Sequence, residues 1–189
     1  MSYDREAAWR LLCEWTASPN LRKHALGVEA AMRARARRLG QDEEAFAAVG
    51  LLHDFDYEKN PTQETHVWVG AKVLREQGWP EGWVRAIEGH ASYTGVPRDT
   101  DMARCLFAVD ELSGFLVACA LVRPDKTLAN VPVDSVLKRM KEKAFARSVN
   151  RDEIRQGADE IGMPLEEHVV FVRDAMASIA GELGLAGIA

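Results

Sequence analysis

Four of the five histidines in this sequence of 189 residues, together with several aspartates, are the side chains best suited to chemistry. Imidazole and carboxylate groups are ligands that transition metals accept. Each of these histidines shares a helical face with apolar residues; His53, for example, follows Phe46 and Val49 at helical spacing. The side chains expected to face the core are His24, His53, Asp54, His66, His90 and Asp110.

Taken one at a time, these residues have ordinary explanations. A single inward histidine is usually structural, and an inward aspartate usually pairs with an arginine or caps a backbone. Asp110 is harder to explain, because an unpartnered carboxylate in the middle of an apolar helix is strongly disfavoured. Gly114, one turn later, leaves room for a partner. Four imidazoles and two carboxylates in one small bundle are most economically explained by a shared metal ion.

The adjacent pair His53 and Asp54 restricts where such a site lies. Neighbouring side chains on a helix diverge by about 100°, so both can bind one metal, or bridge two, only near a helix end. The loop that begins at Asp56 places the pair there.

The elements that must position these residues are helices, because apolar residues recur at intervals of three and four. Ser18 and Pro19 offer a cap before a helix that Gly40 ends, and Asp42 opens the next one. We therefore predict an all-α fold, a compact bundle of about eight or nine helices in a single domain. The expected helices cover about residues 4–17, 21–40, 42–55, 63–77, 81–91, 100–122, 133–147 and 151–162, and a last one starts at Pro164.

The composition, 47% hydrophobic and 28% charged, is that of an ordinary globular protein. The longest apolar run, residues 115–122, is too short to span a bilayer, and the first residues lack the pattern of a secretory signal. The three cysteines form no C-x-x-C pair, which indicates reduced thiols. We therefore expect a cytoplasmic protein. The net charge of −5 argues against general nucleic-acid binding.

The ordered set His24, His53-Asp54 and Asp110 resembles the H…HD…D signature of the HD-domain superfamily of metal-dependent phosphohydrolases. The resemblance covers about residues 20–125 as the HD core, with a C-terminal helical extension over about 126–189. Residues 108–151 further resemble small bacterial HDIG-type hydrolases. Phe55-Asp56 stands where the HDIG motif has Ile-Gly, so the resemblance implies metal ligation and no specific substrate.

The resemblance implies one metal ion held by His24, His53, Asp54 and Asp110. It implies a second ion held by His66 and His90, with Asp54 as a bridge. Such ligands suit iron, manganese, cobalt, nickel or zinc. The metals would bind a phosphate oxygen and supply a hydroxide at neutral pH, so Asp54 is a catalytic candidate. Asp56 and Glu58 are candidates for an acid or base, although acids in a polar loop are more often solvated or capping.

Substrate-binding candidates lie in residues 123–155, a segment that contains nine basic and five acidic residues. Such a basic segment can steer an anionic, phosphorylated substrate toward the metals. The ordinary explanation is a solvated helix face with ion pairs along it. Lys126 is the preferred candidate, because we expect it in a loop that folds over the site, and Lys138 and Lys141 are weaker ones. Tyr57 and Tyr93 are candidates for lining a pocket.

Three functions are compatible with the sequence. The leading one is hydrolysis of a phosphate ester, a nucleotide or small phosphorylated compound, at a centre of one or two metal ions. The second is a di-iron oxygenase, because some HD-fold proteins with this ligand set use an iron pair and oxygen. The third is a metal-binding sensor or interaction module without turnover. The apolar C-terminal residues 169–189 also suggest a helix-mediated homodimer.

Overall fold

Side-chain caps set several of the helix starts. Asp42 accepts hydrogen bonds from the backbone N–H groups of Glu44 and Ala45, and Ser18 caps the preceding helix in the same way. Gly40 ends that helix in the left-handed conformation, with a φ of 66°. These three predicted boundaries are confirmed.

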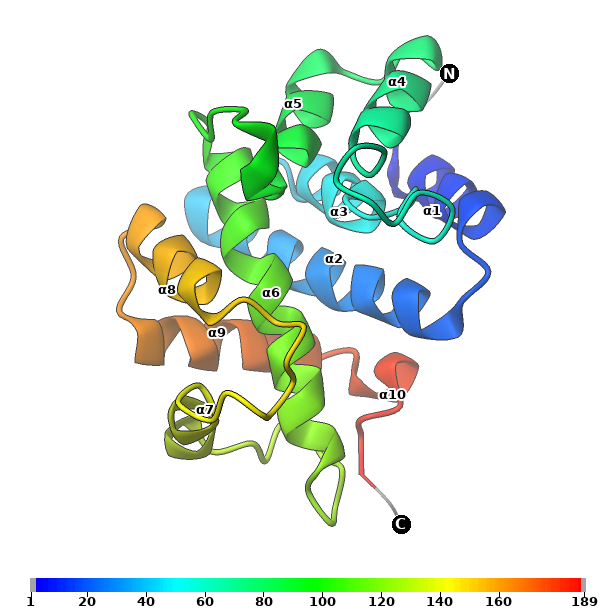
Figure 1. Ribbon diagram of the computed structural model, residues 1–189. Coiled ribbons are helices and arrows are strands. Elements are labelled where there is room, and N and C mark those ends of the chain that lie inside the picture. The colour runs from blue at the N-terminus through cyan, green and yellow to red at the C-terminus, as the bar shows by residue number, and fades with distance from the viewer. Residues whose placement is uncertain (1–2, 188–189) are drawn as a thin grey trace.

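The computed structural model describes residues 3–187, and within that range it contains ten α-helices, one short 3-10 helix and no β-strand (Figure 1). The predicted all-α fold is confirmed; the helix that the sequence does not predict is α10, a single turn. None of the helices in the described range is both long and apolar enough to cross a membrane. The elements are α1 (Arg5–Trp15), α2 (Pro19–Leu39), α3 (Glu43–Leu52), α4 (Trp68–Glu76), α5 (Glu81–His90), η1 (Ser92–Thr94), α6 (Asp101–Leu121), α7 (Val133–Arg139), α8 (Arg151–Glu160), α9 (Leu165–Ala177) and α10 (Ala180–Leu183).

Three helices, α3, α4 and α7, are several residues shorter than the sequence predicts. α4 starts at Trp68 instead of residue 63, because Val67 has a φ of 67°, which a right-handed helix does not accept. α7 ends at Arg139 and is followed by turns instead of continuing to residue 147. α3 ends at Leu52 instead of residue 55, so the pair at positions 53 and 54 lies just past the helix end, near a helix end as predicted but not within the last turn.

The two longest helices, α2 and α6, cross at the centre of the molecule (Figure 1). α3 packs on α2, and α5 and α8 pack on α6. Gly50 allows the close approach of α3 to α2, because a Cβ atom at this position would lie only 3.0 Å from the Cα atom of Glu29. This approach brings the residues that follow α3 next to His24 on α2.

His168, the histidine outside the signature, has a structural role. Its side chain is fully buried on α9, and its Nε2–H donates a hydrogen bond of 2.8 Å to the backbone carbonyl of Ala108 on α6. Nδ1 is buried without a hydrogen-bond partner. Burial lowers the pKa of His168 from 6.5 to about 4.

The buried imidazole predicts a loss of stability in acid. Because the pKa of His168 is lower in the folded state than in the unfolded chain, the unfolded state takes up the proton first as the pH falls below 6.5. Its contribution is present above pH 6.5 and decreases toward pH 4. Between pH 7 and pH 5 we expect a loss of about 2 kcal/mol in unfolding free energy from this residue. Urea unfolding of the metal-free protein measures it.

The matched variant is His168→Gln, which keeps an N–H donor and removes the titration. We expect its stability to fall by about 2 kcal/mol less than that of the wild type between the two pH values. Equal losses in both proteins would show that His168 does not control the acid sensitivity.

Candidate metal centre

Two groups of possible metal ligands meet where α2, α3, α5 and α6 come together. The first contains His24, His53 and Asp54, and the second contains Asp54, His66 and His90. Within each group the ligand atoms lie within 4.8 Å of one another. Asp110, in the middle of α6, adjoins the first group. The structure thus brings together all six residues that the sequence singles out as metal ligands.

The first group surrounds a small volume between α2 and α6. His24 Nε2 lies 3.0 Å from Asp110 Oδ1 and 3.2 Å from His53 Nε2, and the distance from His53 Nε2 to Asp110 Oδ1 is 3.4 Å. Ligand atoms that share one ion at about 2.0–2.2 Å are separated by about this much. Two imidazole nitrogens at this separation also need a proton or cation between them, because their lone pairs repel.

Asp54 joins the two groups. Its Oδ1 atom lies 3.1 Å from His66 Nε2 and 3.3 Å from His90 Nε2, whereas its Oδ2 atom lies 3.5 Å from His53 Nε2. The two oxygens of one carboxylate therefore face different histidines. This is the arrangement that a ligand bridging two ions requires.

Hydrogen bonds fix the orientation of three of the imidazoles. Nδ1 of His53 lies 2.8 Å from the carbonyl oxygen of Gly50, and Nδ1 of His90 lies 2.5 Å from that of Ile87. His66 Nδ1 lies 3.0 Å from a carboxylate oxygen of Asp56. Each Nδ1 atom is a donor in these bonds, so in the neutral ring each Nε2 atom carries the lone pair, and it faces the acids. The donor set therefore fits a metal ion.

The electrostatics of the cluster favour positive charge at its centre. Burial works to lower the pKa of His53, but the carboxylates of Asp54 and Asp110 outweigh it and raise this pKa well above the usual value. Burial also opposes protonation of His66, yet Asp54 and Asp56 raise its pKa to about 9. Although burial raises the pKa of Asp110, the nearby histidines bring it well below its usual range. Protons on the histidines or bound metal cations can supply the positive charge that these carboxylates favour.

Asp56 and Glu58 both accept hydrogen bonds from other groups, and neither is among the residues that line the cleft. Asp56 is only 1% exposed, accepts from His66 through one oxygen, and accepts a 2.8 Å bond from the backbone N–H of Gly70 through the other. Glu58 accepts from the backbone N–H groups at positions 17 and 18, between α1 and α2. Asp56 thus positions a histidine, and Glu58 ties a turn. An acid or base role for either residue stays a prediction.

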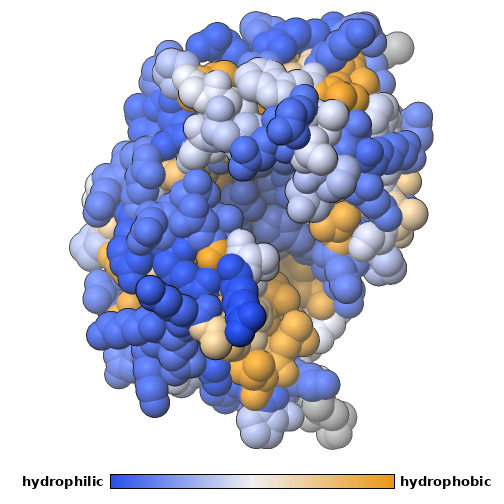
Figure 2. All heavy atoms as spheres, viewed as in Figure 1, coloured by the Kyte–Doolittle hydropathy of each residue, from blue (hydrophilic) through white to orange (hydrophobic). Residues whose placement is uncertain are grey.

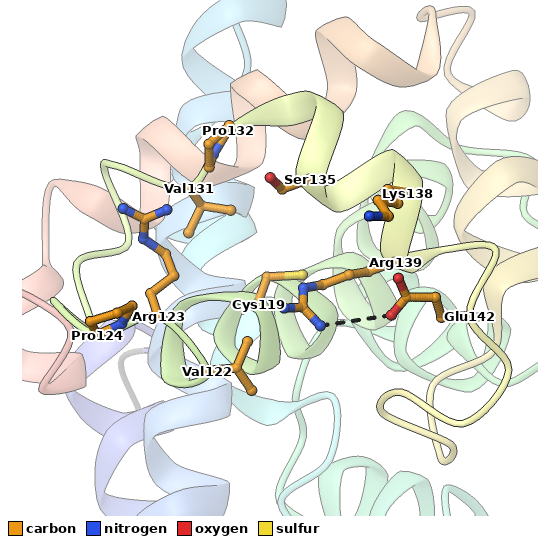
Figure 3. A pocket seen from close by; sticks show the side chains of 10 residues that line it. All are labelled: Cys119, Val122, Arg123, Pro124, Val131, Pro132, Ser135, Lys138, Arg139 and Glu142. Carbon is orange, nitrogen blue, oxygen red and sulfur yellow. Dashed lines mark ion pairs between the residues drawn. The ribbon is translucent and has the colours of Figure 1, made fainter.

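None of the three candidate lysines lines the cleft above the histidines. Lys138 lines a separate cavity of about 280 Å³ between the end of α6 and α7 (Figure 3). Lys126 lies in the loop after α6 with a φ of 46°, and Lys141 is exposed in the turns after α7. The end of α6 at Leu121 is about 16 Å from Asp110 along the helix, which is why this region does not fold over the site.

The cleft itself has a volume of about 470 Å³, and the molecular surface is hollowed there (Figure 2). Its lining residues include Tyr57 and Tyr93, in agreement with the sequence, and no lysine or arginine within the described range 3–187 lines it. Sequence reasoning missed Glu111, which also lines the cleft and accepts a bond from the backbone N–H of Asn150. Burial and the charge of Asp110 raise the pKa of Glu111 to about 7. Its only sequence signal is its position next to Asp110.

Comparisons with known proteins agree with this geometry. Residues 21–114, which include all six candidate ligands, match the family model of the HD domain. No curated protein matches the chain.

Two solved structures share the arrangement of helices. One is the HD domain of the phosphodiesterase PgpH from L. monocytogenes, with a TM-score of 0.54 and 13% identity over 90% of this chain and 97% of that one. The other is the same domain in complex with cyclic-di-AMP, with a TM-score of 0.51 and 14% identity over 91% and 96%. These likenesses show that the fold is that of an HD domain.

Proposed function

We propose that this chain, whose residues 21–114 match the family model of the HD domain, is a metal-dependent phosphohydrolase. The observation that carries the proposal is the sharing of Asp54 by two groups of ligands at the base of one cleft. A cytoplasmic location and a dimer formed through residues 169–189 stay predictions.

The ligands divide between two ions. His24, His53 and Asp110 would hold the first ion together with Asp54, and His66 and His90 would hold the second with the same aspartate. Iron, manganese, cobalt, nickel or zinc suits such nitrogen and carboxylate ligands. Bound there, the ions supply Lewis acidity toward a phosphate oxygen and lower the pKa of water.

A phosphate ester is the substrate class that fits this cleft. No lysine or arginine is among the described residues that line it, so apart from the histidines that face Asp54 and Asp110 its side chains offer no positive charge to a phosphate. Asp54, Asp110 and Glu111 instead make it acidic, and only bound cations reverse that sign. The complex of a similar domain with cyclic-di-AMP supports a nucleotide or related phosphate compound.

The proposal is tested by anaerobic purification, metal analysis and iron spectroscopy, followed by a phosphate-release screen with several divalent metals. We expect two ions per chain and metal-dependent release of phosphate from an ester. Two irons with oxygen-dependent turnover and no phosphate release would instead identify an oxygenase. Bound metal with neither activity would identify a binding module.

Asp56→Asn is expected to weaken the second metal site. The change removes the negative charge that accepts the hydrogen bond from His66 Nδ1–H. The asparagine amide has only one oxygen, so its NH₂ group would face a second donor, either His66 Nδ1–H or the backbone N–H of Gly70. Loss of such a partner typically costs 10- to 100-fold in metal affinity. We expect about this loss for the second ion and little change for the first, measured by isothermal titration with Mn²⁺.

The matched control is Asp42→Asn, the same chemical change at the start of α3, where asparagine is an equally good cap. Equal affinity for both ions in Asp56→Asn and in the control would contradict a positioning role for Asp56.

A further inference from the structure

A second cavity adjoins the metal cleft. It has a volume of about 380 Å³ and lies between the start of α2, the second half of α6 and the segment 183–185. His24 and Gly114 line both this groove and the cleft. The two cavities therefore meet at these two residues.

One face of α6 runs through both cavities and changes character along its length. Asp110 is followed on this face by Gly114, Val117 and Leu121, at intervals of four, three and four residues. The last of these is about 16 Å from the first along the helix axis. Leu121, the last residue of α6, is 51% exposed. The face thus leads from a metal ligand to an open apolar surface.

The opposite wall of the groove is fixed in place. Leu183 and Leu185 are almost fully buried, and the carbonyl oxygen of Leu185 accepts a 2.9 Å bond from the backbone N–H of Leu128. An isolated bridge between Thr127 and Ala186 adds to this attachment. All of these residues lie outside the segment 21–114 that matches the HD domain, so this wall belongs to the C-terminal extension of the chain.

Gly114 keeps the junction between cleft and groove open. A Cβ atom built at this position meets no atom within 4 Å, although the residue lies in the middle of a helix. Glycine in a helix interior destabilises the helix by about 1 kcal/mol relative to alanine. Open space at the junction is a reason for glycine at this position.

We propose that the groove binds an apolar organic group of the phosphate ester whose phosphate lies at the metal centre. The inference rests on the proposed function. Asn20, Lys23 and His24 form the polar side of the groove, and Val117, Leu121 and Leu183 form its apolar side. A sugar-like group would press hydroxyl groups against this apolar side without hydrogen-bond partners, which is unfavourable. An aliphatic or aromatic group buries these side chains instead and gains affinity in proportion to its apolar area.

The test uses two non-hydrolysable phosphonates on the Mn²⁺-loaded protein. Methylphosphonate carries only the anionic group, whereas 4-phenylbutylphosphonate adds an apolar group long enough to reach the groove. We expect isothermal titration to show binding at least about tenfold tighter for the second ligand. Gly114→Leu fills the junction and should bring the ratio of the two affinities close to one. Val117→Ser, which leaves the junction open, should reduce the ratio by at least about threefold.

The control is Gly82→Leu, the same substitution at an exposed helical glycine whose Cβ atom also meets no other atom; it should keep the full ratio. A wild-type ratio near one, no binding of either phosphonate, or an unchanged ratio in Gly114→Leu would overturn the inference. Phosphate release without any preference for apolar ligands would reject the proposed role of the groove and leave the proposed hydrolase activity standing. A clear preference for the apolar ligand without phosphate release from any ester would reject the proposed hydrolase activity and leave the proposed apolar binding in the groove standing.

Discussion

Asp54→Ala is expected to remove both metal ions at once. One oxygen of this carboxylate lies 3.1 Å from His66 Nε2 and 3.3 Å from His90 Nε2, and the other faces His53 at 3.5 Å. Each ion would lose a ligand, and the cluster would lose the charge that offsets two cations. We expect the metal content to fall from two ions per chain to fewer than 0.5, roughly, because each site keeps only an incomplete ligand set.

Phosphate release should fall with the metal, by about a thousandfold or more. Metal ions contribute several kcal/mol of transition-state charge stabilisation, and each 1.4 kcal/mol is a factor of about ten in rate. The control is Asp134→Ala, at an exposed aspartate in the first turn of α7. Circular dichroism checks that both variants fold. A variant that lacks Asp54 and still binds two ions would exclude the bridging role.

The fold was predictable where short-range rules govern it. Ser18, Gly40 and Asp42 act within one turn of their own positions, and the structure has the predicted helix boundaries at all three. The sequence could not show that Val67 turns the chain with a positive φ, because no local rule assigns that conformation to a valine. The start of α4 therefore differs from the prediction.

The candidate site divides in the same way. Periodicity places His24, His90 and Asp110 on helices, and the structure agrees. His53 and His66, also expected on helices, lie in the turns after α3 and before α4, although the structure still brings them to the same centre. The environment of Asp56 instead depends on Gly70, fourteen residues away, whose missing side chain leaves room for the carboxylate: a Cβ atom there would lie 2.9 Å from Asp56 Cγ. Composition alone suggested that lysines in residues 123–155 reach the substrate, but the length of α6 carries them away from the cleft.

His66→Ala should separate the two ions. His66 contacts Asp54 and Asp56, and no hydrogen bond or ion pair joins it to His24 or Asp110 within the described residues. The first ligand group is therefore left complete. We expect the metal content to fall from two ions to one, and phosphate release to fall by about a hundredfold, because one of two groups that stabilise transition-state charge is lost.

The matched variant is His24→Ala, which removes a histidine from the first group and leaves Asp54, His66 and His90 in place. Metal analysis of the two variants should give one ion each, and the double variant should give none. Two ions retained in His66→Ala would show that this histidine is not a ligand. Loss of both ions in each single variant would show that the two sites fill together, since the shared carboxylate of Asp54 then binds neither cation without the other.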